Sequence, residues 1–162
     1  WKLYGVVHWD EKDLRGPGNI DPDVDPHKLT GSLYEIGGKL KAGRFLVHGN
    51  VYTSQAAGQQ FTAITQFGDI SDWGAWLQVG YDVSKNWSLF AFHGITDPDD
   101  DDVLEWVGPS GRVKNEQSAF MIRWKRKQYQ LGLEYLVDTV TTGAAKDELT
   151  GNQFAFSAMY AF

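Results

Sequence analysis

The chain has 162 residues, a formal net charge of −6 and no cysteine. Its length fits a single domain, so we expect residues 1–162 to form one unit without a separate soluble domain. The lack of cysteine excludes disulfides, thiolate catalysis and cysteine-ligated zinc, and the negative charge argues against nucleic acid as a partner. No apolar run approaches the roughly 18 residues of a membrane-spanning helix.

Proline positions divide the chain. All five prolines fall within residues 17–26 and 98–109. Because proline cannot donate to a β-ladder, we predict loops around both segments, at 10–29 and 97–114. Small and polar residues predict two further long connections, Gln55–Trp73 and Thr141–Gly151. The segments predicted as strands are Trp1–Trp9, Ser32–Lys41, Arg44–Ser54, Gly74–Val83, Trp87–Thr96, Gln117–Lys125, Tyr129–Val140 and Gln153–Phe162.

These segments have a repeat of two residues, which excludes an amphipathic helix. In the segment from Tyr129, Leu131, Leu133 and Tyr135 fall on one side, whereas Glu134 and Asp138 fall on the other. Most segments are about 9–11 residues long, the length that a tilted strand needs to cross a bilayer. Long connections alternate with short hinges along the chain, which is typical of outer-membrane barrels.

A soluble β-barrel or sandwich shows the same alternation, and two observations favour the membrane alternative. Most acidic residues fall in the long connections, whereas the short hinges are basic. Aromatic residues gather near strand ends, as expected for rings at the depth of lipid headgroups. Those predicted on the apolar face are Trp1, Trp9, Phe45, Tyr81, Trp87, Trp124, Tyr129, Tyr160 and Phe162.

Two stretches carry a family resemblance. The last strand, NQFAFSAMYAF, ends on Phe162 and resembles the terminal strand of bacterial outer-membrane β-barrels. The run KNWSLFAFHGITDPDDDD, the pair Arg123–Trp124 and the motif LGLEYL are similar to the C-terminal part of trimeric porins. The resemblance implies an all-β, antiparallel up-and-down transmembrane β-barrel, with eight strands here as half of a roughly sixteen-stranded barrel.

The resemblance also implies a location and partners. We expect the bacterial outer membrane, with long loops extracellular and both termini periplasmic. The expected partners are outer-membrane lipid and lipopolysaccharide, other copies in a homotrimer, and the barrel-insertion machinery that reads the Phe162 strand.

The polar face of the strands supplies the candidate site. In a porin these residues line a water-filled lumen, where fixed charges select solutes. In a narrow eight-stranded barrel they form an ion-paired plug instead. The predicted pore-lining residues are Glu35, Lys39, His48, Asn50, Gln78, Arg123, Glu134 and Asp138.

Other chemistry is weakly supported. Asp21–Pro26 and Asp97–Asp102 place carboxylates at alternate positions, compatible with Ca²⁺, but lack the glycine and distal glutamate of an EF-hand loop. We therefore interpret them as solvated loops and expect no cofactor. The histidines lack metal-type spacing, and nothing orients Ser157 and His48 as a catalytic pair, so we expect no enzyme.

The sequence thus predicts a porin for passive diffusion of ions or small hydrophilic solutes. The alternative is a closed, non-conducting eight-stranded barrel that serves as an anchor, adhesion or structural protein. A soluble lipocalin-like barrel is disfavoured because the chain ends in a strand and not in a helix.

Overall fold

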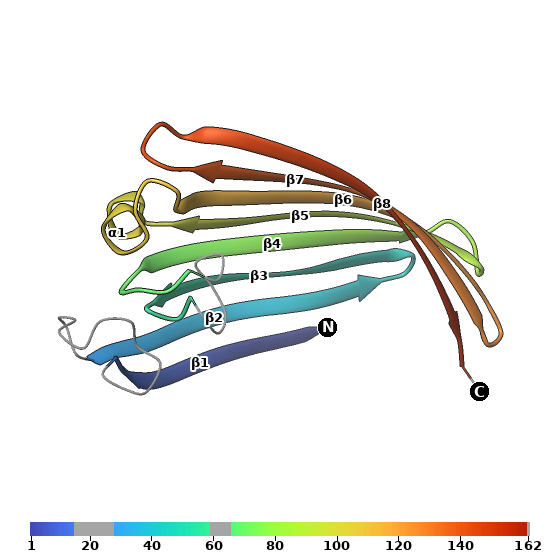
Figure 1. Cartoon of the computed structure of the whole chain (residues 1–162). Helices are drawn as coiled ribbons and strands as arrows, with labels where there is room; N and C mark the ends of the chain where they lie inside the picture. The colour runs from blue at the N-terminus through green and yellow to red at the C-terminus, as the bar shows by residue number, and fades with distance from the viewer. Residues whose placement is uncertain (15–27, 59–65, 162) are drawn as a thin grey trace.

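The computed structural model describes residues 1–14, 28–58 and 66–161, and consists of one antiparallel sheet with its strands in chain order (Figure 1). Each strand pairs with the strands before and after it, so β1 and β8 are the sheet edges. The elements are β1 Lys2–Asp13, β2 Lys28–Ala42, β3 Phe45–Gln55, β4 Ser71–Asp82, β5 Trp87–Pro98, α1 Asp100–Trp106, β6 Arg112–Arg126, β7 Tyr129–Thr142 and β8 Asp147–Tyr160.

Short turns join the strands at one end of the sheet (Figure 1). Pairing of Ala42 with Phe45 leaves two residues between β2 and β3, and Gly43 has a positive φ of 58°. The β6–β7 turn is equally tight, and there the positive φ falls on Lys127, at 51°. Tight hairpins need this left-handed backbone. All three hinges lie where the sequence predicted them.

The opposite end of the sheet differs from prediction. There, the strands extend beyond the predicted segments: β1 continues to Asp13, β5 includes Pro98 and β6 begins at Arg112. The predicted long connection at Thr141–Gly151 is wrong, because Thr142 pairs with Asp147 and leaves a short turn. Residues 15–27 of the predicted loop 10–29 and residues 59–65 of the predicted connection Gln55–Trp73 lie outside the described residues, as does Phe162.

The acidic segment after Pro98 was predicted as a loop but contains the helix α1. Asp99 caps its N-terminus: one carboxylate oxygen accepts hydrogen bonds from the backbone N–H groups of Asp101 (3.0 Å) and Asp102 (3.1 Å). Negative charges in the first turn are favourable because they face the positive end of the helix dipole. No helix within the described ranges is long and apolar enough to cross a bilayer.

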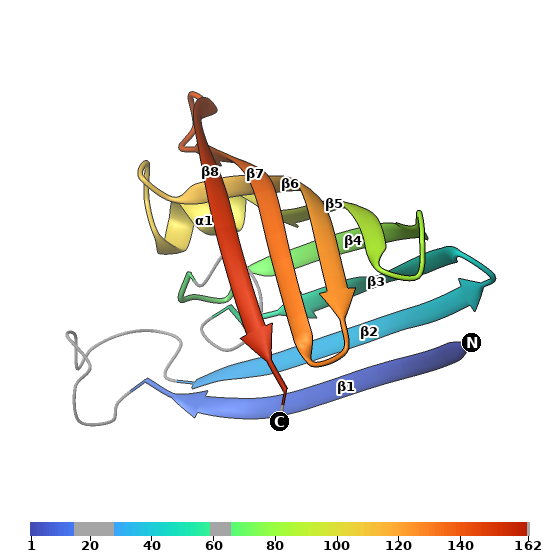
Figure 2. The same ribbon diagram turned by 90° about the vertical axis from the view of Figure 1, so that its right-hand side faces the viewer.

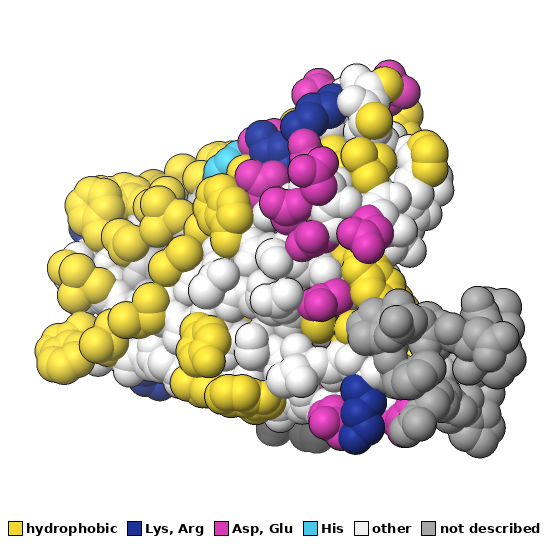
Figure 3. Space-filling model, turned by 90° about the vertical axis from the view of Figure 1, so that its left-hand side faces the viewer, with side chains coloured by type: hydrophobic (Ala, Val, Ile, Leu, Met, Phe, Trp, Pro, Cys, Tyr) yellow, Lys and Arg dark blue, Asp and Glu magenta, His cyan; other side chains and the backbone are white. Residues whose placement is uncertain are grey.

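One face of the sheet is apolar and exposed. Cross-strand pairing places side chains such as Val7, Ile36, Val47 and Leu133 on it, each at least 42% exposed. Figure 3 shows a broad area of hydrophobic side chains, with the acidic residues gathered beside it. Exposed apolar patches of this size mark a surface that meets lipid or another apolar partner. The predicted aromatic residues Trp1, Trp9, Phe45, Tyr81, Trp87, Tyr129 and Tyr160 are exposed here.

The other face is concave. Tyr4 and His48 lie on β1 and β3, two strands apart, yet their ring centroids are 6.4 Å apart. The Tyr4 ring reaches this position because it lies over Gly37 of β2, the strand between them. Figure 2 shows the curl, with β8 crossing in front of the other strands.

Buried side chains gather at the α1 end. Val103 of α1 packs with Ile70 and Val113, and Trp106 packs against this cluster and against Leu29 with its neighbours. Leu29 lies on the concave face, the same face as Leu33 and Glu35. The β5–β6 connection therefore folds over the concave face at this end of the sheet.

Candidate functional site

All eight predicted pore-lining residues lie on the concave face of the sheet. Pairing carries this face from strand to strand, because directly paired residues project to the same side of a sheet. Lys39 pairs with His48, which pairs with Gln78, and together they form one row across β2, β3 and β4. Lys2 pairs with Lys39, and His8 pairs with Leu33, so both side chains also lie on the concave face.

Glu35 and Asn50 form the closest contact within the predicted set. The Asn50 side-chain N–H donates to Glu35 Oε1 at 2.7 Å. The amide is thereby oriented with its Oδ1 atom pointing away from Glu35, and this buried oxygen has no hydrogen-bond partner among the described residues. Both side chains are partly buried on neighbouring strands.

Arg123 occupies a separate part of the concave face. Its guanidinium lies 4.7 Å from the ring centroid of Phe90 and donates to Ser88 Oγ at 3.3 Å. The aromatic ring thus holds the cation against the wall. Glu134 and Asp138, both on β7, lie further along the sheet and pair with Met121 and Gln117.

Three inward-facing aromatic residues, Tyr4, Trp76 and Phe92, are missing from the predicted site. Tyr4, His48, Trp76 and Phe92 form a row of ring contacts, with centroids 4.7 Å apart for His48–Trp76 and 5.9 Å apart for Trp76–Phe92. Their alternation with the apolar face was visible in the sequence. The sequence, however, predicts lipid contact for the aromatic residues near strand ends and names only polar or charged residues and His48 for the pore wall.

Glycines make room for these rings. A Cβ at Gly74 or Gly37 would clash with the ring of Tyr52 or Tyr4, and one at Gly80 would lie 2.8 Å from Phe90. Each such glycine is the direct cross-strand partner of its aromatic residue, so the ring lies flat over the neighbouring strand. The pairs are Tyr4–Gly37, Tyr52–Gly74 and Phe90–Gly80. The rings consequently cover the wall without filling the space in front of it.

The concave face holds a cavity of about 560 Å³ between β1 and β5. Glu35, Asn50, Tyr52 and Trp76 line it, together with His8. The Tyr52 hydroxyl lies 3.2 Å from Thr96 Oγ1 and 3.4 Å from Asp72 Oδ2, which fixes its ring. This size lies within the range of small-molecule sites in proteins.

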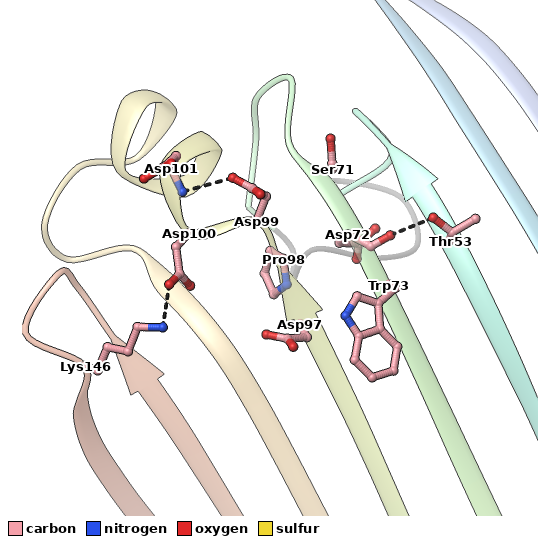
Figure 4. A pocket seen from close by; sticks show the side chains of 10 residues that line it. All are labelled: Thr53, Ser71, Asp72, Trp73, Asp97, Pro98, Asp99, Asp100, Asp101 and Lys146. Carbon is pink, nitrogen blue, oxygen red and sulfur yellow. Dashed lines mark hydrogen bonds and ion pairs between the residues drawn. The ribbon is translucent and has the colours of Figure 1, made fainter.

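A second cavity, of about 650 Å³, lies at the α1 end and is lined by several aspartates (Figure 4). Three of these carboxylates already have partners: Asp99 caps α1, Asp72 accepts a hydrogen bond from Ser54 Oγ, and Asp100 lies 2.5 Å from Lys146 Nζ. The hydrogen bond to Asp100 raises the pKa of the Lys146 ammonium. Among the described residues, no cluster of three or more histidine or carboxylate side chains fits a metal ion. Asp21–Pro26 falls outside this part of the chain.

Comparison with known proteins identifies the fold. No protein-family model matches the chain, and no curated protein matches it. Its structure is similar to the crystal structure of the outer membrane channel DcaP of Acinetobacter baumannii, with a TM-score of 0.78 and 14% sequence identity. The alignment covers 99% of this chain and 46% of the channel, so the chain spans about half of that protein's length. The likeness confirms the predicted antiparallel up-and-down fold and its resemblance to part of an outer-membrane β-barrel.

Proposed function

We propose that this chain forms part of the wall of an outer-membrane channel for passive diffusion of ions or small hydrophilic solutes. The observation that carries the proposal is one curled sheet with an exposed apolar convex face and a concave face that bears the polar side chains. A barrel wall between lipid and water requires this division. The similarity to an outer membrane channel supports the same function.

Closure of the wall requires further strands. β1 and β8 each pair on one side only within the described part of the chain. An eight-stranded barrel closed on itself leaves an interior only wide enough for side chains. The open edges therefore favour a larger barrel over the closed, non-conducting anchor, and such a barrel leaves room for water along the concave face.

The proposed orientation follows from the two ends of the sheet. We place the short basic turns and both termini in the periplasm and the α1 end outside, next to lipopolysaccharide. We further propose assembly as a homotrimer after insertion through the C-terminal strand. The lumen wall then includes the predicted pore-lining residues, with no chemical step in the role and no requirement for a cofactor.

Planar-bilayer recording of the natural full-length gene product tests the function. We expect stepwise conductance increases in symmetric salt, because each inserted barrel adds one water-filled path. Stable insertion without conductance would contradict the channel and favour the anchor.

Orientation is tested separately by cysteine labelling of intact cells. Ala144→Cys, in the exposed β7–β8 turn, should react with a membrane-impermeant maleimide, and Ser84→Cys, in the exposed β4–β5 turn, should react only after lysis. The reverse pattern would invert the proposed topology.

A further inference from the structure

We infer that the 560 Å³ cavity on the concave face is a subsite for a small organic cation with a primary ammonium group, an assignment that rests on the proposed channel function. The cavity combines a carboxylate, a hydrogen-bond acceptor without a donor, and aromatic walls. Each of these three features favours a positively charged donor over an anion or an apolar solute.

The carboxylate is Glu35. Within the described residues, no lysine, arginine or histidine forms an ion pair with it, and its contact in the cavity is the neutral amide of Asn50 at 2.7 Å. The nearest lysine along β2 on this face is Lys39, four residues away, or about 13 Å along the strand. Glu35 therefore contributes a negative charge to the cavity wall that no neighbouring cation neutralises.

The acceptor is Asn50 Oδ1. It is buried and receives no hydrogen bond from the described residues, and the bond from Asn50 to Glu35 fixes its direction. Buried acceptors are nearly always paired in folded proteins, so this oxygen beside Glu35 has the capacity to accept one further hydrogen bond. An ammonium group has three N–H donors, enough for Glu35 and Asn50 together.

Aromatic rings complete the site. Trp76 and Tyr52 line the same cavity, and the direct pairing of Tyr52 with Gly74 holds its ring flat against the wall. Aromatic faces attract cations, and tryptophan does so most strongly. His8 also lines the cavity, but its Nε2 atom lies 3.4 Å from Asp10 Oδ1, so a carboxylate matches any charge on that ring.

The aspartates at the α1 end would direct cations to this subsite. One of them, Asp72, lies on β4. Its side chain is on the same face of that strand as Trp76, which lines the subsite. A cation that enters past acidic side chains meets a favourable potential before it reaches Glu35. The subsite and the entrance thus both favour cations.

Blockade of single-channel current by n-butylammonium tests the assignment, with n-butanol and butyrate as neutral and anionic probes of similar shape. In the full-length channel we expect concentration-dependent interruptions with butylammonium only. Glu35→Gln should raise the half-blocking concentration about tenfold or more, since it removes a charge-assisted hydrogen bond. Trp76→Leu should raise it about threefold to tenfold. Glu148→Gln, an exposed glutamate on the convex side of β8, serves as the matched control and should leave the block unchanged.

The outcomes separate this inference from the proposed function. Conductance without block by butylammonium, block unaffected by Glu35→Gln, or equal block by butanol would each overturn the subsite while the channel stands. A wild-type protein that inserts but never conducts would overturn the channel itself. Heat-modifiable electrophoretic mobility of each variant confirms that its barrel has assembled.

Discussion

At the residue scale, the pairing register determines which environment each side chain meets. Leu133 and Glu134 are neighbours in β7, yet Leu133 is exposed on the apolar face and Glu134 shares the concave face with Met121. A shift of one residue in register would exchange them. The two faces therefore make separate predictions for substitutions that are adjacent in sequence.

The first prediction compares two arginine substitutions in β7. Leu133→Arg should impair assembly, because a charge at the middle of the lipid-facing surface costs about 2–4 kcal/mol. Glu134→Arg should assemble as well as the wild type, since its side chain lies on the concave face, which we propose borders water. Urea titration of the folded barrel in detergent or lipid measures both. Equal destabilisation, or greater loss with Glu134→Arg, would contradict the assigned faces.

The second prediction concerns the glycines under the inward-facing rings. Gly74→Val should push the Tyr52 ring off the wall and reduce single-channel conductance, because the added carbons occupy the position of that ring. Gly151→Val is the control, since nothing lies within 4 Å of its added Cβ and it also belongs to the concave face. The double variant Gly74→Val with Tyr52→Ala should recover conductance. Unchanged conductance in Gly74→Val would show that the ring does not border the lumen.

At the element scale, α1 is held by a few contacts and not by its own helical preference. A helix of 7 residues is too short to be stable alone. Val103 is fully buried against Ile70 and Val113, and Asp102 accepts a hydrogen bond from the Ser71 backbone. Tertiary contacts therefore place the β5–β6 connection over the concave face.

The third prediction follows from that packing. Val103→Asp should release α1, because a buried carboxylate without a partner is strongly unfavourable, and the segment should become sensitive to proteinase K. Val107→Asp makes the same substitution at a position that is 37% exposed and should keep the wild-type resistance. Equal resistance of the two variants would contradict the anchoring role of Val103.

The same contacts explain how far the sequence could predict the elements. Alternation located all the strands and the three short turns at the end opposite α1, because one face of each strand is apolar where it would cross lipid. It did not show how far the strands extend at the α1 end, since both faces of β1 near Asp13 are polar and no alternation remains to be read. The helix was missed because Pro98 and the aspartates predict a loop, and the packing partners of Val103 lie far away in sequence.

At the scale of the whole molecule, the two faces of the sheet explain which features of the site the sequence could predict and which it could not. Alternation placed Glu35, His48 and Arg123 on a common side, and the pairing register puts all three on the concave face. It could not show that Asn50 contacts Glu35, or that Arg123 lies on Phe90, because those contacts depend on register between strands. The central claim is that the concave face borders water through which ions pass.

The reversal potential of Arg123→Glu tests this claim most directly. Arg123 lies on the concave face, so replacing its positive charge with a negative one should shift the ion preference of the lumen toward cations. The measurement is the single-channel reversal potential of the full-length protein in a planar bilayer under a salt gradient. Arg126→Glu, an exposed residue at the end of β6, makes the same charge change beyond the concave row and should shift the potential much less. A clear shift toward cations in Arg123→Glu is the predicted result; a reversal potential identical to that of the wild type would contradict it.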